Sequence, residues 1–216
     1  MPKKEVPLQT LSDFVPPDTA DPVLSYLKKY GVHLTITQAR RSVLGDYRHR
    51  YQHQPHRISV NGNLNPYAFL ITLLHELAHL LTFERFGNRV AAHGAEWKSC
   101  FGDLLKVFLE ARSFPEPLEK ELMRTMRNPA ASSCAEDGLI RVLRQYNNPE
   151  KKERRVLVEE LSLQELFNTP EGRQFRIEKK MRKRFLCTEQ STGKQYLFSP
   201  VYEVIPVDRS GDRFPN

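Results

Sequence analysis

Three histidines and one glutamate are the residues of this 216-residue chain with the clearest potential for chemistry. His75 and His79 are one helical turn apart, so on an α-helix both imidazoles lie on the same face and can reach one metal ion. Glu76 follows the first histidine and can contact a metal-bound water without binding the metal. This H-E-x-x-H spacing predicts a hydrolytic zinc site in which the two histidines are ligands and Glu76 is the general base.

The residues around this motif predict a long, buried helix. Asn65 is a good N-cap, and Pro66 suits the first helical turn, where its missing N–H costs nothing. No helix breaker follows before Gly87, so we expect a helix over residues 66–86 that is apolar nearly all round. Imidazoles and a carboxylate in a buried helix need a partner, and a metal ion is one. The other interpretation is two core histidines bonded to backbone carbonyls.

The third ligand must come from outside this helix turn. Metzincins place a histidine shortly after the motif, where this chain has Arg85, so that class is excluded. His93 lies further on, and a short loop after the helix would return it to the site. Glu84 and Glu96 are the carboxylate alternatives, although Glu84 points away from the metal face. We therefore expect His93 to complete a three-histidine site for one Zn²⁺ per chain.

This set of motifs resembles the SprT-like family of zinc metallopeptidases, which is related to the Spartan proteases that degrade proteins crosslinked to DNA. The resemblance covers about residues 20–112. The segments that carry it are H-E-x-x-H, His93-Gly94-x-x-Trp97-Lys98, Leu44–Arg48 and Ile58–Asn61. It implies Glu76 as the catalytic acid/base. The zinc ligands that it implies are His75, His79 and His93.

The sequence predicts an α+β fold. We expect a zincin-like metalloprotease core, with short strands packed on the H-E-x-x-H helix and further helices, and a small β-rich region after it. The strands expected in the core are 33–37, 46–51 and 57–61. Besides 66–86, the helices expected there are 22–30, 94–112 and 116–127.

The C-terminal part departs from the family pattern. Many SprT-like proteins end in a zinc ribbon with two C-x-x-C pairs, but the three cysteines here are scattered, which excludes a four-cysteine site. A metal-free degenerate ribbon is the expected substitute. The predicted elements of the C-terminal region are a helix over 137–146 and strands near 156–159, 173–179, 182–189 and 195–207. The predicted domains are a loose segment 1–17, the SprT-like domain 18–128 and the β-rich region 129–216.

The charge balance suggests a polyanionic partner. The formal net charge is +7, and basic residues gather in one run close to several aromatic residues. A basic strand surface with aromatic side chains can bind single-stranded DNA, and the alternative is an ordinary solvated charged face. The residues proposed for nucleic-acid binding are Lys179, Lys180, Arg182, Lys183 and Arg184.

The remaining features concern compartment and secondary sites. The first residues lack the apolar segment of a signal peptide, and we find no 18-residue apolar run, so we expect a cytoplasmic protein without a membrane span. Scattered cysteines fit a reducing compartment. His49, His53 and His56 are expected to be exposed loop residues rather than a second metal site.

These features predict a zinc metalloendopeptidase, a hydrolase that cleaves DNA-associated or DNA-crosslinked proteins in DNA repair or the stress response. The alternative is a nucleic-acid-binding or stress-response adaptor with a structural zinc, and a zinc hydrolase of another substrate is a third interpretation. Glu76 favours an enzyme, because a structural site is closed by a fourth protein ligand and does not need this carboxylate. Tyr47, Arg48 and Tyr67 are equivalent candidates for assisting at the reacting carbonyl oxygen.

Overall fold

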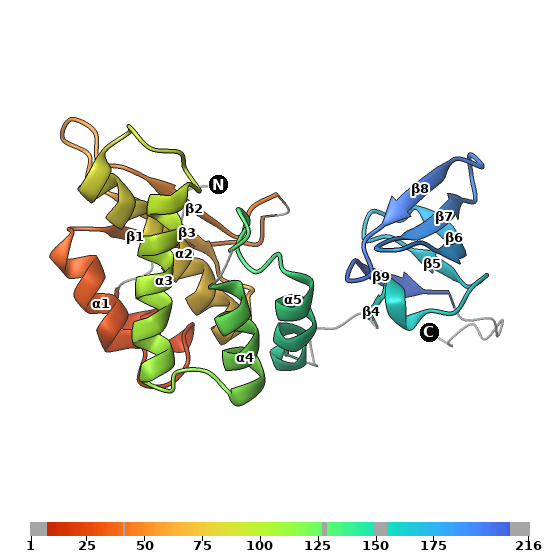
Figure 1. Ribbon diagram of the computed structural model, residues 1–216, viewed down its shortest axis with the longest axis horizontal. Coiled ribbons are helices and arrows are strands. Elements are labelled where there is room, and N and C mark those ends of the chain that lie inside the picture. The colour runs from red at the N-terminus through yellow and green to blue at the C-terminus, as the bar shows by residue number, and fades with distance from the viewer. Residues whose placement is uncertain (1–7, 41, 127–128, 149–154, 208–216) are drawn as a thin grey trace. The chain divides into compact units, whose positions relative to one another are not determined.

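The computed structural model describes residues 8–40, 42–126, 129–148 and 155–207. The chain forms two compact units that divide between Asn147 and Asn148 (Figure 1). The first unit contains both helices and strands and the second is built mainly of strands, so the chain is α+β as predicted. The candidate site lies wholly within the first unit.

A three-stranded sheet forms one layer of the first unit. Its strands are β1 (His33–Thr37), β2 (Gly45–Arg48) and β3 (Arg57–Asn61). β3 is central, parallel to β1 and antiparallel to β2, which leaves β2 at one edge of the sheet. Leu34, Ile58 and Val60 are buried, so one face of the sheet belongs to the hydrophobic core.

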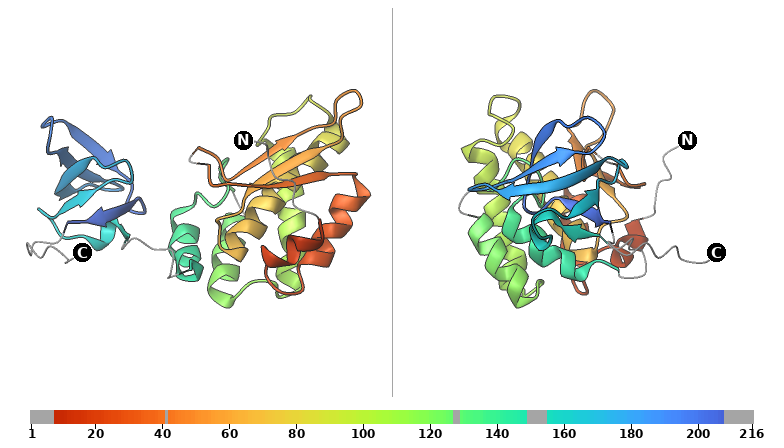
Figure 2. Two further views of the ribbon diagram at one scale, coloured as in Figure 1. Left: turned by 180° about the vertical axis from the view of Figure 1, so that it is seen from behind. Right: turned by 90° about the vertical axis from the view of Figure 1, so that its right-hand side faces the viewer.

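The helices of this unit pack around one central helix. Their bounds are η1 (Leu8–Asp13), α1 (Ala20–Lys29), α2 (Pro66–Phe86), α3 (Ala95–Glu110), α4 (Glu116–Thr125), α5 (Asp137–Leu143) and η2 (Arg144–Tyr146). α2 contacts β2 and β3 on one side and α3 on another. Figure 2 shows the strands lying across α2, with the other helices around it. The central position of α2 explains its apolar composition.

The predicted signals at both ends of α2 are confirmed. The Asn65 side chain accepts a hydrogen bond from the backbone N–H of Ala68 at 2.9 Å, and Pro66 is the first helical residue. Gly87 ends the helix with a φ of 63°, a conformation that glycine adopts without strain. Although α2 is long and apolar enough to cross a membrane, 78% of that apolar window is buried within the unit, as in the core helix of a globular protein.

Two of the predicted domain boundaries differ from the structure. Of the segment expected to be loose, residues 1–7 lie outside the described residues, but η1 follows them, and Leu11 and Val15 are buried in the core. The boundary expected at residue 128 lies instead after Asn147. α5 belongs to the first unit because it packs on α4, and because Asn65 Nδ2 donates to the Leu143 carbonyl oxygen at 3.0 Å.

The second unit contains a six-stranded antiparallel sheet with the order β4-β9-β5-β6-β7-β8. The strands are β4 (Val156–Leu157), β5 (Leu166–Asn168), β6 (Gln174–Lys180), β7 (Phe185–Glu189), β8 (Gln195–Phe198) and β9 (Glu203–Pro206). β5 was not predicted, and the strand expected over 195–207 is two strands separated by a turn. The sheet has its own core of buried residues, which include Phe167, Phe175 and Cys187.

Candidate metal centre

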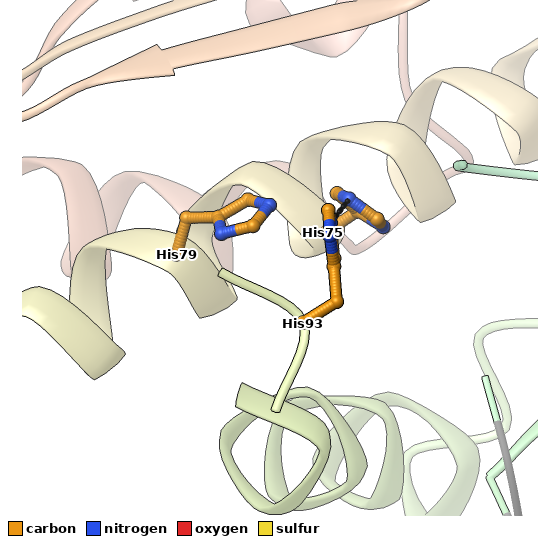
Figure 3. A group of neighbouring side chains, drawn as sticks. All are labelled: His75, His79 and His93. Carbon is orange, nitrogen blue, oxygen red and sulfur yellow. Dashed lines mark hydrogen bonds between the residues drawn. The ribbon is translucent and has the colours of Figure 1, made fainter. Parts of the chain in front are cut away.

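Three imidazoles converge on one point of the first unit. His75 and His79 extend from α2, and His93 reaches them from the turn before α3 (Figure 3). One ring nitrogen of each histidine lies within 4.8 Å of the corresponding nitrogens of the other two. The Nε2 atoms of His75 and His93 are 3.3 Å apart. The structure therefore brings together the three predicted ligands in a group that can hold a metal ion.

The donor set fits zinc. With Zn–N bonds of about 2.0–2.1 Å, two nitrogens of a tetrahedral site are about 3.3–3.4 Å apart, which agrees with the 3.3 Å between His75 and His93. Burial lowers the pKa of His75 to about 3 and that of His79 to about 4, and it also lowers the pKa of His93. At neutral pH the rings are therefore uncharged and offer lone pairs to a cation.

The Trp97 side chain packs against all three histidine rings. Its side chain is fully buried on α3, and its ring centroid lies 4.6 Å from that of His75, 5.4 Å from that of His79 and 4.7 Å from that of His93. A single rigid indole thus touches every candidate ligand. This contact explains how a loop histidine and two helical histidines keep a common orientation, and it gives Trp97 a packing role.

Glu76 lies buried beside the histidine group, where strand β2 passes close to α2. A Cβ atom placed on Gly45 would be only 2.5 Å from Glu76 Oε1 and 2.8 Å from the Thr72 methyl carbon. The carboxylate therefore occupies space that exists because residue 45 has no side chain. Burial raises the pKa of Glu76 to about 8, the nearby charge of Asp46 adds to this, and Arg40 opposes it.

A cavity of about 560 Å³ opens onto these residues. His75, Glu76, His79 and His93 all line it, together with residues of β2, the end of α2 and the following loop. Among the described residues, no fourth histidine, cysteine or carboxylate joins the three-histidine group. The site can therefore admit a further ligand from the solvent side.

The other candidate ligands and histidines are placed elsewhere. Glu84 lies outside the metal group, with Oε1 at 3.1 Å from Arg50 Nη2 and 3.3 Å from His56 Nε2. Glu96, in the first turn of α3, is also outside that group. The expectation of exposed loop histidines is wrong for His56, which is 2% exposed and accepts a hydrogen bond from the Tyr47 hydroxyl at 2.9 Å. It is also wrong for His49, which is partly buried, whereas His53 is exposed.

The three candidates for assisting at the carbonyl oxygen are now distinguishable. Tyr47 lines the cavity, and its ring is parallel to that of His79. Arg48 is exposed and pairs with Asp46 at 3.0 Å. Tyr67 packs against Tyr146, with ring centroids 4.8 Å apart, and does not line this cavity. Only Tyr47 of the three lies at the site.

The predicted basic residues lie in the second unit. Lys179 and Lys180 are the last residues of β6, and Arg182, Lys183 and Arg184 lie between β6 and β7. All five side chains are exposed. Arg184 lines a pocket of about 350 Å³ whose other members include Phe175, Tyr196, Phe198 and Tyr202. The basic run and the aromatic residues noted in the sequence are therefore neighbours in the fold, at least around Arg184.

Gly45 contributes to the site in a way that the sequence does not predict. Gly45 matters because of a contact with a helix that comes much later in the chain. Leu44–Arg48 is one of the segments that carry the family resemblance, and a glycine inside a strand signals a close approach of another group. That signal was present but did not identify its partner.

Comparison with known proteins gives one match. Residues 23–113 match the model of the SprT-like family. This segment contains α2, the three histidines and Glu76. No curated protein and no solved structure matches the chain significantly.

Proposed function

Because residues 23–113 match the model of the SprT-like family, we propose that this protein is a zinc metalloendopeptidase with a zincin-like core. The observation that carries the proposal is the convergence of His75, His79 and His93 next to the buried Glu76 in an open cavity. This family is associated with metallopeptidases, and three neutral imidazoles with an adjacent carboxylate are what zinc-assisted hydrolysis requires.

The three histidines would hold the ion through one ring nitrogen each. When bound, zinc would supply a Lewis acid that polarises a carbonyl group and lowers the pKa of a water towards about 7. The three imidazoles remain neutral, so they add no charge that would weaken this effect. The buried Trp97 side chain, on α3, would keep the imidazole rings oriented and exclude water from the side of the rings that faces α3.

Glu76 would carry the proton. Its carboxylate accepts a proton from the attacking water and returns it to the nitrogen of the leaving amine. A general base works best when its pKa is near the working pH, and burial already moves the pKa of Glu76 in that direction. Gly45 leaves room for the carboxylate to keep its place against β2.

The open site supports an enzyme over an adaptor. A structural zinc is enclosed by four protein ligands, whereas here only three potential ligands converge among the described residues. The cavity over them is large enough for a stretch of polypeptide. An adaptor would also have no use for a buried carboxylate beside the ligands, because burying such a group costs stability.

We further propose that the substrates are proteins associated with or crosslinked to DNA. The support for this is the family resemblance and the exposed basic run in the second unit, with Arg184 next to an aromatic pocket. Aromatic side chains stack on bases while cations contact the phosphates. DNA repair, a stress response and a cytoplasmic location are parts of the same proposal.

A cleavage assay tests this function. Zinc-loaded protein is incubated with a basic DNA-binding protein, with and without single-stranded DNA. The Glu76→Gln variant is the control for hydrolysis, and a triple charge reversal at Arg182, Lys183 and Arg184 is the control for DNA. We expect cleavage that DNA stimulates, that Glu76→Gln reduces by about 10²–10⁴-fold, and whose DNA stimulation the triple variant loses. Absence of cleavage with one zinc bound per chain would favour the adaptor.

A further inference from the structure

The cavity over the metal centre has an aromatic wall that the proposed hydrolysis does not use. Tyr47 of β2, His49 just after it, and Phe83 of α2 all line this cavity on the side of His79. The loop that carries His93 adds small apolar side chains to the same cavity, namely Val90, Ala91 and Ala92. Phe83 is only partly buried, so an apolar ring remains accessible from the cavity.

Ring contacts hold two members of this wall together. The His49 and Phe83 rings are stacked, with centroids 4.5 Å apart and an interplanar angle of 10°. The His56 ring packs edge-on against the Phe83 ring, with the two centroids 5.9 Å apart. His49 Nδ1 lies 2.9 Å from the Arg50 carbonyl oxygen and donates to it, which sets the orientation of the imidazole.

The Tyr47 hydroxyl is fixed by hydrogen bonding to residues that do not line the cavity. Its hydroxyl donates to His56 Nδ1 at 2.9 Å. The backbone N–H of Arg50 also donates to Nδ1, at 3.3 Å, so this nitrogen is an acceptor and the ring proton is on Nε2. That Nε2 faces Glu84 Oε1 at 3.3 Å. With its hydroxyl engaged in this way, Tyr47 presents its ring, parallel within 4° to the ring of His79.

We propose that Tyr47, His49 and Phe83 form a specificity subsite that accepts a large apolar or aromatic side chain of the substrate, next to the cleaved bond. The inference rests on the proposed peptidase function and adds the substrate class. The subsite is continuous with the metal centre, because the wall and the three ligands line one cavity. A wall whose rings are already packed costs little ordering entropy when a side chain binds to it.

The charges of the cavity agree with an apolar occupant. Apart from Glu76, the only carboxylate among the described lining residues is Asp46, and Arg48 Nε pairs with it at 3.0 Å. A lysine or arginine side chain of the substrate would therefore find no unpaired acid in this wall. An acidic side chain would find aromatic faces, which repel anions.

Equilibrium binding tests the subsite without requiring turnover. Zinc-loaded Glu76→Gln protein is titrated with peptides that differ at one position, which holds phenylalanine, lysine, aspartate or glycine. We expect the phenylalanine peptide to bind about tenfold more tightly than the glycine peptide, because it buries apolar surface on the wall. In the Phe83→Ala and His49→Ala backgrounds the preference should fall to about threefold or less.

Phe86→Ala is the matched control, because Phe86 lies on the same helix, is 36% exposed and does not line the cavity. It should keep the full preference. Equal binding of all four peptides, or a preference unchanged by both wall variants, would overturn the subsite. The wild-type zinc protein is then tested on a peptide library. Cleavage without a fixed apolar position would also contradict the subsite, whereas no cleavage would contradict the proposed function and leave the binding result to decide on the subsite.

Discussion

At the scale of single residues, the site depends on the uncharged nitrogens of three histidines and on the space that Gly45 leaves for the Glu76 carboxylate. The histidines supply neutral nitrogens because burial lowers their pKa values. Glu76 keeps its place because Gly45 has no side chain. The H-E-x-x-H spacing alone predicted the two helical histidines and Glu76, since one helical turn fixes their common face. Gly45 could not be assigned a role, because its contact with α2 exists only in the folded chain.

Gly45→Ala should separate catalysis from metal binding. The added methyl group would lie 2.5 Å from Glu76 Oε1, so the carboxylate must move. We expect kcat to fall about 10- to 100-fold, because such a displacement of a reacting group is costly, while zinc affinity is unchanged. Steady-state cleavage and a zinc competition titration measure the two effects. Gly102→Ala is the control, because a methyl group there meets nothing within 4 Å. A variant with normal kcat would contradict the role of Gly45.

Trp97→Ala should weaken the metal centre although Trp97 is not a ligand. The indole touches all three imidazoles, so its removal frees their orientation and leaves a cavity in the core. We expect zinc affinity to fall about 10- to 100-fold, as for other residues that orient metal ligands. The free energy of unfolding should decrease by about 3–5 kcal/mol. Trp97→Phe should recover most of the affinity. If both variants bound zinc like the wild type, the orienting role would be wrong.

At the scale of elements, local pattern predicted most helices and strands but not their packing. α2 was predicted with its bounds because its caps and apolar run are local signals. β5 (Leu166–Asn168) was missed because three residues carry no clear periodicity. The docking of η1 and α5 on the first unit could not be seen in the sequence, because the contacts join residues far apart in the chain.

One ion pair should make the sheet of the second unit sensitive to acid. Arg173 Nε lies 2.7 Å from Glu189 Oε1, and this contact and the Thr192 hydroxyl lower the pKa of Glu189 to about 2. The unfolded value is near 4.5, so the stabilisation is complete above that pH and is lost as the pH falls towards 2. The protection of the β6 and β7 amides against hydrogen exchange, measured relative to the intrinsic exchange rate at each pH, should therefore decrease between pH 4.5 and 3.

The Glu189→Gln variant provides the comparison for this effect. Because glutamine does not titrate, the difference in protection between the two proteins should shrink as the pH is lowered through this range. Glu165→Gln, in the same unit but outside this ion pair, is the control. A difference that stays constant from pH 6 to pH 3 would show that the pair does not stabilise the sheet.

At the scale of the whole molecule, the two units divide the proposed work. The first contains the candidate metal centre, its cavity and the segment that matches the SprT-like family. The second contains the exposed basic run and the aromatic pocket at Arg184. The sequence predicted both groups of residues but placed the boundary too early, because α5 has no sequence signal that assigns it to the first unit.

The proposed activity is the cleavage of peptide bonds with one zinc ion that three histidines hold beside Glu76. The most direct measurement is the cleavage rate of metal-free protein as zinc is added in known amounts. We expect the rate to rise linearly to one equivalent of zinc and then to level off. His93→Ala should need far more zinc, and Glu76→Gln should bind one equivalent yet remain inactive. Full binding of one zinc by the wild type without cleavage, or equal activity of the Glu76→Gln variant, would contradict the claim.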